Sequence, residues 1–389
     1  MHLLRTAWLL AITAAACTSQ RMSTHMLDSI VARKQGVVDS GAASSTLESG
    51  ILAQAIEDII ALYPKTKCQY NRYLSSVLDI ASAPLTNATI AATKPLDRFS
   101  LATAIHTALT SKVAPVTAQS QNAYQAINAS LALQTRNADG GLWYYVYPEW
   151  SYLDGMFSLL PFMSTYAPAH TNLTDMVLQI SLLRDHCTQK NTSLLFHGYD
   201  YSRRAIWADP RTGASPYVWG RSLGWFLASL VQTWDKLSCQ SVQRGELLTL
   251  CNLTKDITVQ LSRSLVQYAD PETGAWWQIV TLPGERGNYL ESSSTALFTF
   301  SLLKALRIGL LSGHQTDYKS AALKAYEYTL REFITDTGNG TIGFNQTVSV
   351  CSLNSTASFE YYTTRPIVPN SLLGESAFIL TALEVERLR

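Results

Sequence analysis

Apolar residues along this chain recur at steps of three and four positions, the spacing of one face of an α-helix. Clear examples are Leu297, Phe300, Leu303, Leu306 and Leu310, and Leu373, Ala377, Leu380 and Leu383. On this criterion we predict a dozen helices, at residues 27–34, 46–63, 67–82, 97–110, 118–136, 149–167, 169–187, 217–236, 243–269, 289–311, 315–334 and 371–388. Short strand signals lie between them, at 143–147 (WYYVY) and 276–280 (WWQIV). The pattern therefore predicts an all-α fold.

Turns rich in Asp and Gly follow four of these helices, about every 60–70 residues. They are RNADGGLWYYV from Arg136, WADPRTGASPYVW from Trp207, YADPETGAWWQIV from Tyr268 and TDTGNGTIGF from Thr335. This interval is slightly longer than a pair of helices with its connections, so a toroid of helical hairpins would put the loops at one end. Binding sites are usually built on such loops. Convergent turn chemistry is the alternative explanation.

The segment YVWGRSLGWFLASLVQTWD, residues 217–235, predicts a helix with two enclosed faces. One face carries an apolar stripe of Trp219, Leu223, Phe226, Leu227, Leu230 and Trp234. The other carries Arg221, Trp225, Ala228 and Gln232, where a surface helix would carry Lys and Glu. We therefore expect an inner helix of a double ring, with Arg221 in its first turn at the mouth.

Composition narrows the class of partner. The 389 residues carry a formal charge of +1, and this near-neutral balance argues against a nucleic acid. With 47% hydrophobic residues and no Pro- or Ser-rich linker, residues 18–389 are expected to form one large domain. The 10% of aromatic and only 15% of charged residues suit sugar binding, and they also suit a large helical core.

The N-terminus has the features of a signal peptide. Arg5 precedes the short apolar run at 7–16, and small residues near Cys17 suit cleavage, so we assign residues 1–17 to the signal. This run is too short to span a bilayer, and we expect no membrane association. Eight N-x-S/T sequons occur, at Asn87, Asn128, Asn172, Asn191, Asn252, Asn339, Asn345 and Asn354. We expect a secreted, extracellular protein with N-linked glycans.

The sequence contains six cysteines. If Cys17 leaves with the signal or becomes the new terminus, five others remain: Cys68, Cys187, Cys239, Cys251 and Cys351. Cys239 and Cys251 are close enough in sequence to bridge a loop between two helices, and the remaining pairings stay open. Since no CxxC or HExxH motif occurs, we expect no metal and no other cofactor.

Four blocks in collinear order resemble one enzyme family. They are YPEWSYLDGMFSLLPFMSTYA (147–167), FHGYDYSRRAIWADPRTGASPYVWGRSLGW (196–225), NYLESSSTALFTFSLLKALRIGLL (288–311) and FEYYTTRPIVPNSLLGESAFILTALE (359–384). They resemble glycoside hydrolase family 105, the unsaturated rhamnogalacturonyl hydrolases, which are related to the unsaturated glucuronyl hydrolases of family 88. The resemblance extends from about Asp97 to the C-terminus and implies an (α/α)6 barrel, in agreement with the dozen helices.

The resemblance also implies a reaction. Polysaccharide lyases leave a uronic acid with a C4=C5 double bond at the non-reducing end, and the family adds water across it. An acid protonates C4, water adds at C5, and the hemiketal opens and releases the next sugar, whereas an ordinary glycosidase protonates the leaving oxygen. This chemistry needs a protonated carboxyl group, a group that orients water, and a cation for the substrate's carboxylate.

Two aspartates match the family's catalytic residues. Asp154 in YLDG matches the acid/base, and its place between Trp150 and Phe157 puts it beside an apolar stripe, which suits a general acid. A helix-surface aspartate near Gly155 is the alternative. Asp97 in PLDRFS matches the second carboxylate, although an Asp before a helix is also an ordinary N-cap.

Other matching residues would bind the substrate. His197 in FHGYD matches a histidine that contacts substrate or water. Arg221 and Trp225 match a carboxylate-binding arginine and a tryptophan that stacks on the sugar ring. We expect Gly220 and Gly224 to keep the first turn bare, so that a sugar can approach these two side chains.

One position departs from the family pattern. Many members have a Trp-His pair after the Gly-Gly turn, whereas GGLWYY places Tyr144 there. Tyrosine can hydrogen-bond a sugar or water but cannot be cationic, which leaves the identity of the neighbouring sugar open. Trp207 and Tyr289 are further candidates for the sugar-binding rim, with packing as the alternative, and Asp200 could orient His197 or cap the next segment.

The expected partner is an oligosaccharide that ends in an unsaturated uronic acid, by default a rhamnogalacturonan or pectin fragment. An unsaturated glucuronyl hydrolase acting on other uronate fragments is one alternative. A polysaccharide lyase on the same toroid is another, with His197, Tyr144 and Arg221 cast as base and neutralising groups. A non-catalytic carbohydrate-binding barrel is disfavoured because both Asp97 and Asp154 are present.

Overall fold

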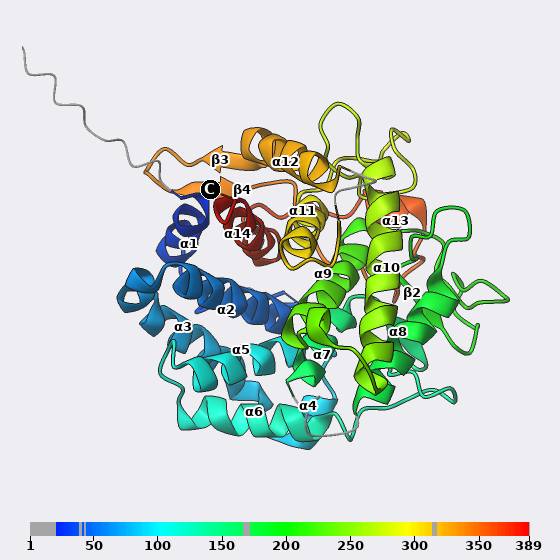
Figure 1. Ribbon diagram of the computed structural model, residues 1–389, viewed down its shortest axis with the longest axis horizontal. Coiled ribbons are helices and arrows are strands. Elements are labelled where there is room, and N and C mark those ends of the chain that lie inside the picture. Colours follow the sequence, from blue (N-terminus) through cyan, green and yellow to red (C-terminus); the bar gives the residue numbers. More distant parts are fainter. Residues whose placement is uncertain (1–20, 39–40, 43, 166–171, 313–316, 389) are drawn as a thin grey trace, which may run out of the picture.

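A computed structural model describes residues 21–38, 41–42, 44–165, 172–312 and 317–388. Six helices form an inner ring in which each contacts the next and the last returns to the first (Figure 1). They are α2 (Ser45–Leu62), α5 (Arg98–Ser111), α7 (Gly155–Ser164), α9 (Gly220–Lys236), α11 (Ser292–Arg307) and α14 (Leu372–Glu386). The predicted signal peptide lies outside the described residues.

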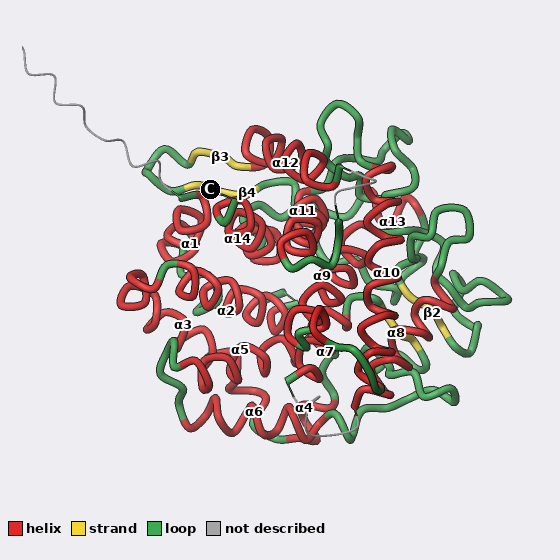
Figure 2. Tube along the Cα trace, in the orientation of Figure 1, coloured by secondary structure: helices red, strands yellow, loops and turns green. Residues whose placement is uncertain are grey.

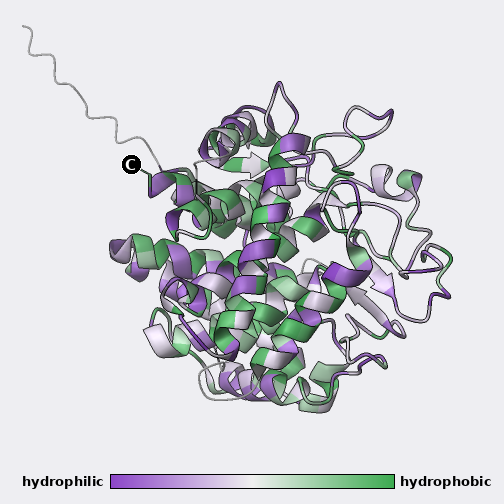
Figure 3. Ribbon diagram, turned by 45° about the vertical axis from the view of Figure 1, so that its right-hand side comes forward, coloured by the Kyte–Doolittle hydropathy of each residue, from purple (hydrophilic) through white to green (hydrophobic). Residues whose placement is uncertain are grey.

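Six further helices form an outer ring. They are α1 (Met22–Ala32), α3 (Lys67–Ser82), α6 (Ala118–Ser130), α8 (Asn172–Cys187), α10 (Glu246–Tyr268) and α12 (Tyr318–Tyr328). Outer and inner helices alternate along the chain, and each outer helix packs on an inner one. Hydrophobic and hydrophilic segments alternate along the helices, as expected where one face meets the ring and the other meets solvent (Figure 3). The predicted (α/α)6 barrel is confirmed.

All twelve predicted helices are present, and two short ones, α4 (Ala88–Ala92) and α13 (Phe359–Thr363), were not predicted. Single turns occur at η1 (Pro64–Thr66), η2 (Ala83–Leu85), η3 (Cys239–Ser241) and η4 (Thr329–Phe333). The start predicted at 149 is too early, because β1 (Trp150–Tyr152) precedes α7.

The predicted strands are wrong. Residues 143–147 and 276–280 form no strand, and the latter make only isolated bridges to Trp219 and Leu290. The strands are instead β1, β2 (Gly198–Asp200), β3 (Ile334–Asp336) and β4 (Ile342–Phe344). They pair antiparallel as β1–β2, with Ser151 opposite Tyr199, and as β3–β4. Both are small two-stranded ribbons at the margin of the helical body (Figure 2).

Helix α9 is the enclosed inner helix that the sequence predicts, since every residue from Gly220 to Trp234 is buried. Its two glycines have another role than expected. A Cβ atom at Gly220 would lie 2.9 Å from Ser294 Cβ, and one at Gly224 would lie 2.9 Å from Leu297 Cβ. The glycines therefore allow α9 to pack closely on α11, and the expectation that they make room for a sugar is wrong.

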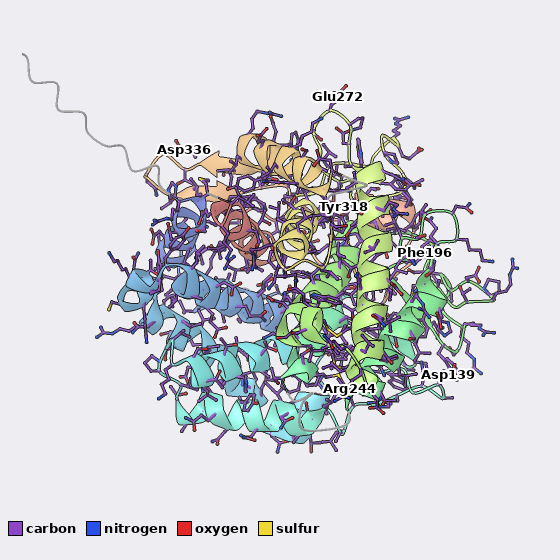
Figure 4. All side chains as sticks on the ribbon, in the orientation of Figure 1. Asp139, Phe196, Arg244, Glu272, Tyr318 and Asp336 are labelled. Atoms are coloured by element: carbon purple, nitrogen blue, oxygen red, sulfur yellow. A yellow bond between two sulfur atoms is a disulfide. The ribbon has the colours of Figure 1, made fainter. Side chains whose placement is uncertain are left out.

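The Asp/Gly loops share a turn geometry. The carboxylates of Asp209 and Asp270 each accept two backbone N–H groups of the following turn, and the Asn137 side chain does the same in its loop. Gly213 and Gly274 follow with φ of +76° and +77°. Asp139, Glu272 and Asp336, from three of the loops, lie around the periphery of the molecule (Figure 4). The recurring Asp- and Gly-rich segments of the sequence thus form similar turns.

The predicted Cys239–Cys251 disulfide is confirmed, with Cα atoms 5.5 Å apart, and it ties the end of α9 to α10. Cys68, Cys187 and Cys351 are free. Among the described residues, no helix is long and apolar enough to cross a membrane. Of the sequon asparagines, Asn87, Asn191, Asn252, Asn339 and Asn354 are exposed, and Asn128 and Asn345 are half-buried.

Candidate active site

A cavity of about 420 Å³ lies where the inner helices begin. Its walls include the first turns of α2, α9 and α14 and the residues just before α5 and α7. The predicted site residues among its lining are Asp97, Asp154, Tyr144, Arg221 and Trp225. The positive ends of several helix dipoles thus converge on one space, which favours an anionic ligand.

Asp154 lies in the turn between β1 and α7 and is 8% exposed. Its carboxylate caps no backbone group of α7. Instead, Oδ2 accepts a 2.6 Å hydrogen bond from Ser222 Oγ and lies 3.1 Å from His197 Nε2. His197 is fully buried, and its Nδ1 lies 2.7 Å from the hydroxyl of Tyr362. His197 is absent from the cavity's described lining, and it lies between Asp154 and Tyr362 of α13. Its predicted contact with substrate or water stays a prediction.

Asp97 directly precedes α5, yet its side chain accepts no hydrogen bond from that helix. The N-cap explanation is therefore wrong. Oδ2 accepts a 2.9 Å hydrogen bond from Tyr144 Oη, and Oδ1 is buried without a partner among the described residues. Burial raises the pKa of Asp97 to about 7; the Tyr144 hydrogen bond opposes this rise, the Asp154 carboxyl adds to it and the Arg98 guanidinium opposes it. Asp97 can hold a proton close to neutral pH.

Tyr144 begins an aromatic wall of the cavity. Its ring stacks on Tyr152 with centroids 4.4 Å apart, and Tyr147 lies nearly parallel to Tyr152 at 6.4 Å. Tyr145 packs edge-on against Tyr147 at 5.3 Å. Tyr145 and Tyr147 are half-exposed, so the wall leads from Asp97 toward solvent. Flat aromatic surfaces of this kind suit the C–H faces of sugars.

Arg221 is 1% exposed and is already engaged. Its guanidinium donates to the carbonyls of Val348 and Ser349 and to Ser293 Oγ, and it lies 3.8 Å from Glu291 Oε1. It thereby braces the segment that continues into the cavity wall at residues 350–352. Its predicted role toward the substrate's carboxylate stays a prediction, and the structure adds this bracing role.

Of the remaining aromatic candidates, one lines the cavity and two do not. Trp225 lines the cavity and packs on Phe157 with ring centroids 4.5 Å apart. Trp207 donates a 2.7 Å hydrogen bond from Nε1 to the carbonyl of Leu353 and is absent from the cavity's described lining. This position favours the packing alternative. Tyr289 is half-buried and is also absent from the cavity's described lining.

The chain is similar to known proteins. Residues 49–389 match the family model described as Glycosyl Hydrolase Family 88. The chain belongs to this family. The protein Atu3128 of Agrobacterium fabrum is 30% identical over 200 residues, which span 49% of this chain and 81% of that protein.

Solved structures agree with the fold of this family 88 protein. A glycoside hydrolase from family 105 of C. acetobutylicum ATCC 824 superposes with a TM-score of 0.79 at 23% identity, over 95% of this chain and 100% of that one. An unsaturated glucuronyl hydrolase from Bacillus sp. GL1 superposes with a TM-score of 0.58 at 13% identity, over 90% and 88% of the two chains. The predicted resemblance to families 105 and 88 is confirmed, and the family model makes the chain a glycoside hydrolase.

Two residues that contact Asp154 and His197 in the family 88 protein were not predicted from the sequence. Ser222 and Tyr362 lie within the blocks that carry the resemblance, but they reach Asp154 and His197 across 68 and 165 positions. Asp200, three residues after His197, was a candidate to orient it; its carboxylate instead accepts from the loop that follows, including Ser202. Among the described residues, no group of three or more His, Cys, Asp or Glu side chains is arranged to hold a metal.

Proposed function

We propose that this protein removes a 4,5-unsaturated uronic acid from the non-reducing end of lyase-generated oligosaccharides, with rhamnogalacturonan and other pectin fragments as the substrate class. The observation that supports it most is the pair Asp97 and Asp154 in one cavity with different surroundings. One carboxyl contacts a hydroxyl and an imidazole, and the other is buried beside a tyrosine. Two carboxyls with different environments suit divided acid and base roles.

In this mechanism the carboxyl of Asp154 gives its proton to C4 of the unsaturated ring. The positive charge that develops at C5 is shared with the ring oxygen, and water adds there. The water adds to C5 as a hydroxyl group and gives its other proton to the Asp154 carboxylate, which regenerates the acid. Ser222 and His197 fix the orientation of Asp154, and Asp97, which keeps a proton up to about pH 7, donates a hydrogen bond to sugar or water. The resulting hemiketal opens and releases the next sugar.

The test is the loss of the near-ultraviolet absorbance of the unsaturated ring, measured on a panel of lyase-generated disaccharides. We expect turnover of galacturonyl-type fragments, and Asp154→Asn should remove it while the circular dichroism spectrum is unchanged. A preference for glucuronyl fragments would redirect the substrate assignment. An increase in absorbance from intact polymer would identify a lyase and refute the proposal.

We also infer that the protein is secreted and glycosylated. The predicted signal peptide and the exposed position of most sequon asparagines support this inference. Expression in a eukaryotic host should give protein in the medium whose electrophoretic mobility increases on treatment with an N-glycanase. Retention inside the cell without glycans would refute it.

A further inference from the structure

One positively charged side chain in the cavity lining has no hydrogen-bond or ion-pair partner among the residues that the structure describes. Lys94 lines the cavity and is half-buried, and its side chain makes no hydrogen bond or ion pair with any described residue. Arg221, the other cation in the lining, is held by Glu291 and by two backbone carbonyls. The free positive charge of this cavity therefore belongs to Lys94.

The backbone of Lys94 is firmly placed. The buried guanidinium of Arg98 donates to the carbonyls of Lys94 and Pro95, at 2.8 and 3.1 Å. Leu96 N donates to the carbonyl of Tyr144 at 2.9 Å. The segment that presents Lys94 is thus anchored to the same elements that position Asp97, three residues later.

The burial of the lining residues indicates which part of a bound oligosaccharide would lie beside Lys94. Asp154, Arg221 and Trp225 are at most 8% exposed, so they form the inner part of the cavity. Lys94 is half-buried, as are Tyr145 and Tyr147 on the aromatic wall. A terminal sugar that reacts at Asp154 would occupy the inner part, and the sugars that follow it would pass Lys94 and these tyrosines.

We propose that Lys94 binds the carboxylate of a second uronic acid, located beyond the bond that is cleaved. The enzyme then prefers longer oligosaccharides, in which acidic and neutral sugars alternate. It acts less well on short fragments that end in a neutral sugar. Tyr145 and Tyr147 supply the surface for the intervening sugar, and the Lys94 ammonium supplies the charge. This inference rests on the proposed function and specifies its substrate further.

The experiment compares three unsaturated substrates. The first is a disaccharide whose second sugar is neutral. The second is a longer oligosaccharide with a uronic acid as its third sugar. The third is the same oligosaccharide with that carboxylate reduced to the alcohol, so that only the charge differs. Steady-state kinetics are measured with the wild type, Lys94→Gln and Lys94→Arg. The exposed lysine Lys65 is outside the cavity, so Lys65→Gln is the matched charge control.

The wild type should prefer the acidic oligosaccharide over its reduced form by about fivefold in kcat/KM, through KM, as expected for one partly exposed ion pair. Lys94→Gln should abolish this preference, whereas Lys94→Arg and Lys65→Gln should retain it. A preference that survives Lys94→Gln, or an equal loss on all three substrates, would overturn the inference while leaving the proposed function intact. If the wild type consumed none of the three, the proposed function itself would fail.

Discussion

The replacement Asp97→Asn tests the environment of the cavity directly. Asp97 is buried with one oxygen unpartnered, and burial raises its pKa from an ordinary 3.8 to about 7. Because the folded protein binds this proton more tightly than the unfolded chain, the carboxyl costs no stability below about pH 4 and an increasing amount as the pH rises to 7. The interval is about three pH units, and each unit is worth about 1.4 kcal/mol. The ionised side chain therefore destabilises the fold by about 4 kcal/mol at pH 8.

Asparagine has the same shape, has no charge to bury, and can still accept the hydrogen bond from Tyr144. We expect Asp97→Asn to be more stable than the wild type by up to about 4 kcal/mol at pH 8 and nearly equal to it at pH 4, while it loses turnover. Urea unfolding at a series of pH values measures the difference. The exposed Asp256 on α10 gives the control Asp256→Asn. The reasoning is refuted if the difference between Asp97→Asn and wild type does not change with pH.

Three further predictions concern neighbouring features. Tyr144→Phe removes the hydrogen bond that lowers the pKa of Asp97, so any limb of the pH–rate profile that reports this group should move to higher pH; a shift to lower pH would contradict the assignment. In Arg221→Lys the single ammonium replaces the planar guanidinium that donates to both the Val348 and Ser349 carbonyls, so we expect kcat/KM to fall at least about tenfold. Unchanged kinetics would exclude the bracing role. The double replacement of Cys239 and Cys251 by serine should lower the free energy of unfolding by about 2–3 kcal/mol, measured by urea unfolding, because the disulfide closes a loop with a sequence separation of 12; equal stability would show that the loop is ordered without it.

The barrel could be predicted because its signal is distributed over the whole chain. Apolar positions at helical spacing located every inner and outer helix, and the two enclosed faces of residues 217–235 identified an inner helix. The strands failed because WYYVY has the aromatic content of a strand but uses it to build a cavity wall. Local pattern cannot distinguish a side chain that pairs across a sheet from one that lines a cavity.

The site was predicted in part for a similar reason. Asp97, Asp154, Arg221 and Trp225 match residues of the family, whereas Tyr144 departs from its pattern, and the structure brings all five to one cavity. What sequence could not supply is the use of each group. Arg221 is held by carbonyls more than a hundred positions away, and Gly220 and Gly224 serve the packing of two helices. Lys94 is one of many lysines in the sequence, and the structure distinguishes it by its place in the cavity without a hydrogen-bond or ion-pair partner among the described residues.

The closure of the inner ring by α14 against α2 joins the two ends of the described chain, so the cavity needs both ends before it is complete. Both catalytic candidates, Asp97 and Asp154, lie in the N-terminal half of the given sequence. The wall at residues 350–352, the tyrosine that holds His197 and the helix that closes the ring all lie between residues 350 and 386. A growing chain therefore carries the carboxylates long before it has a cavity to enclose a substrate, and its unpaired inner helices present apolar faces until α14 arrives. The order of the chain places the chemistry first and its enclosure last.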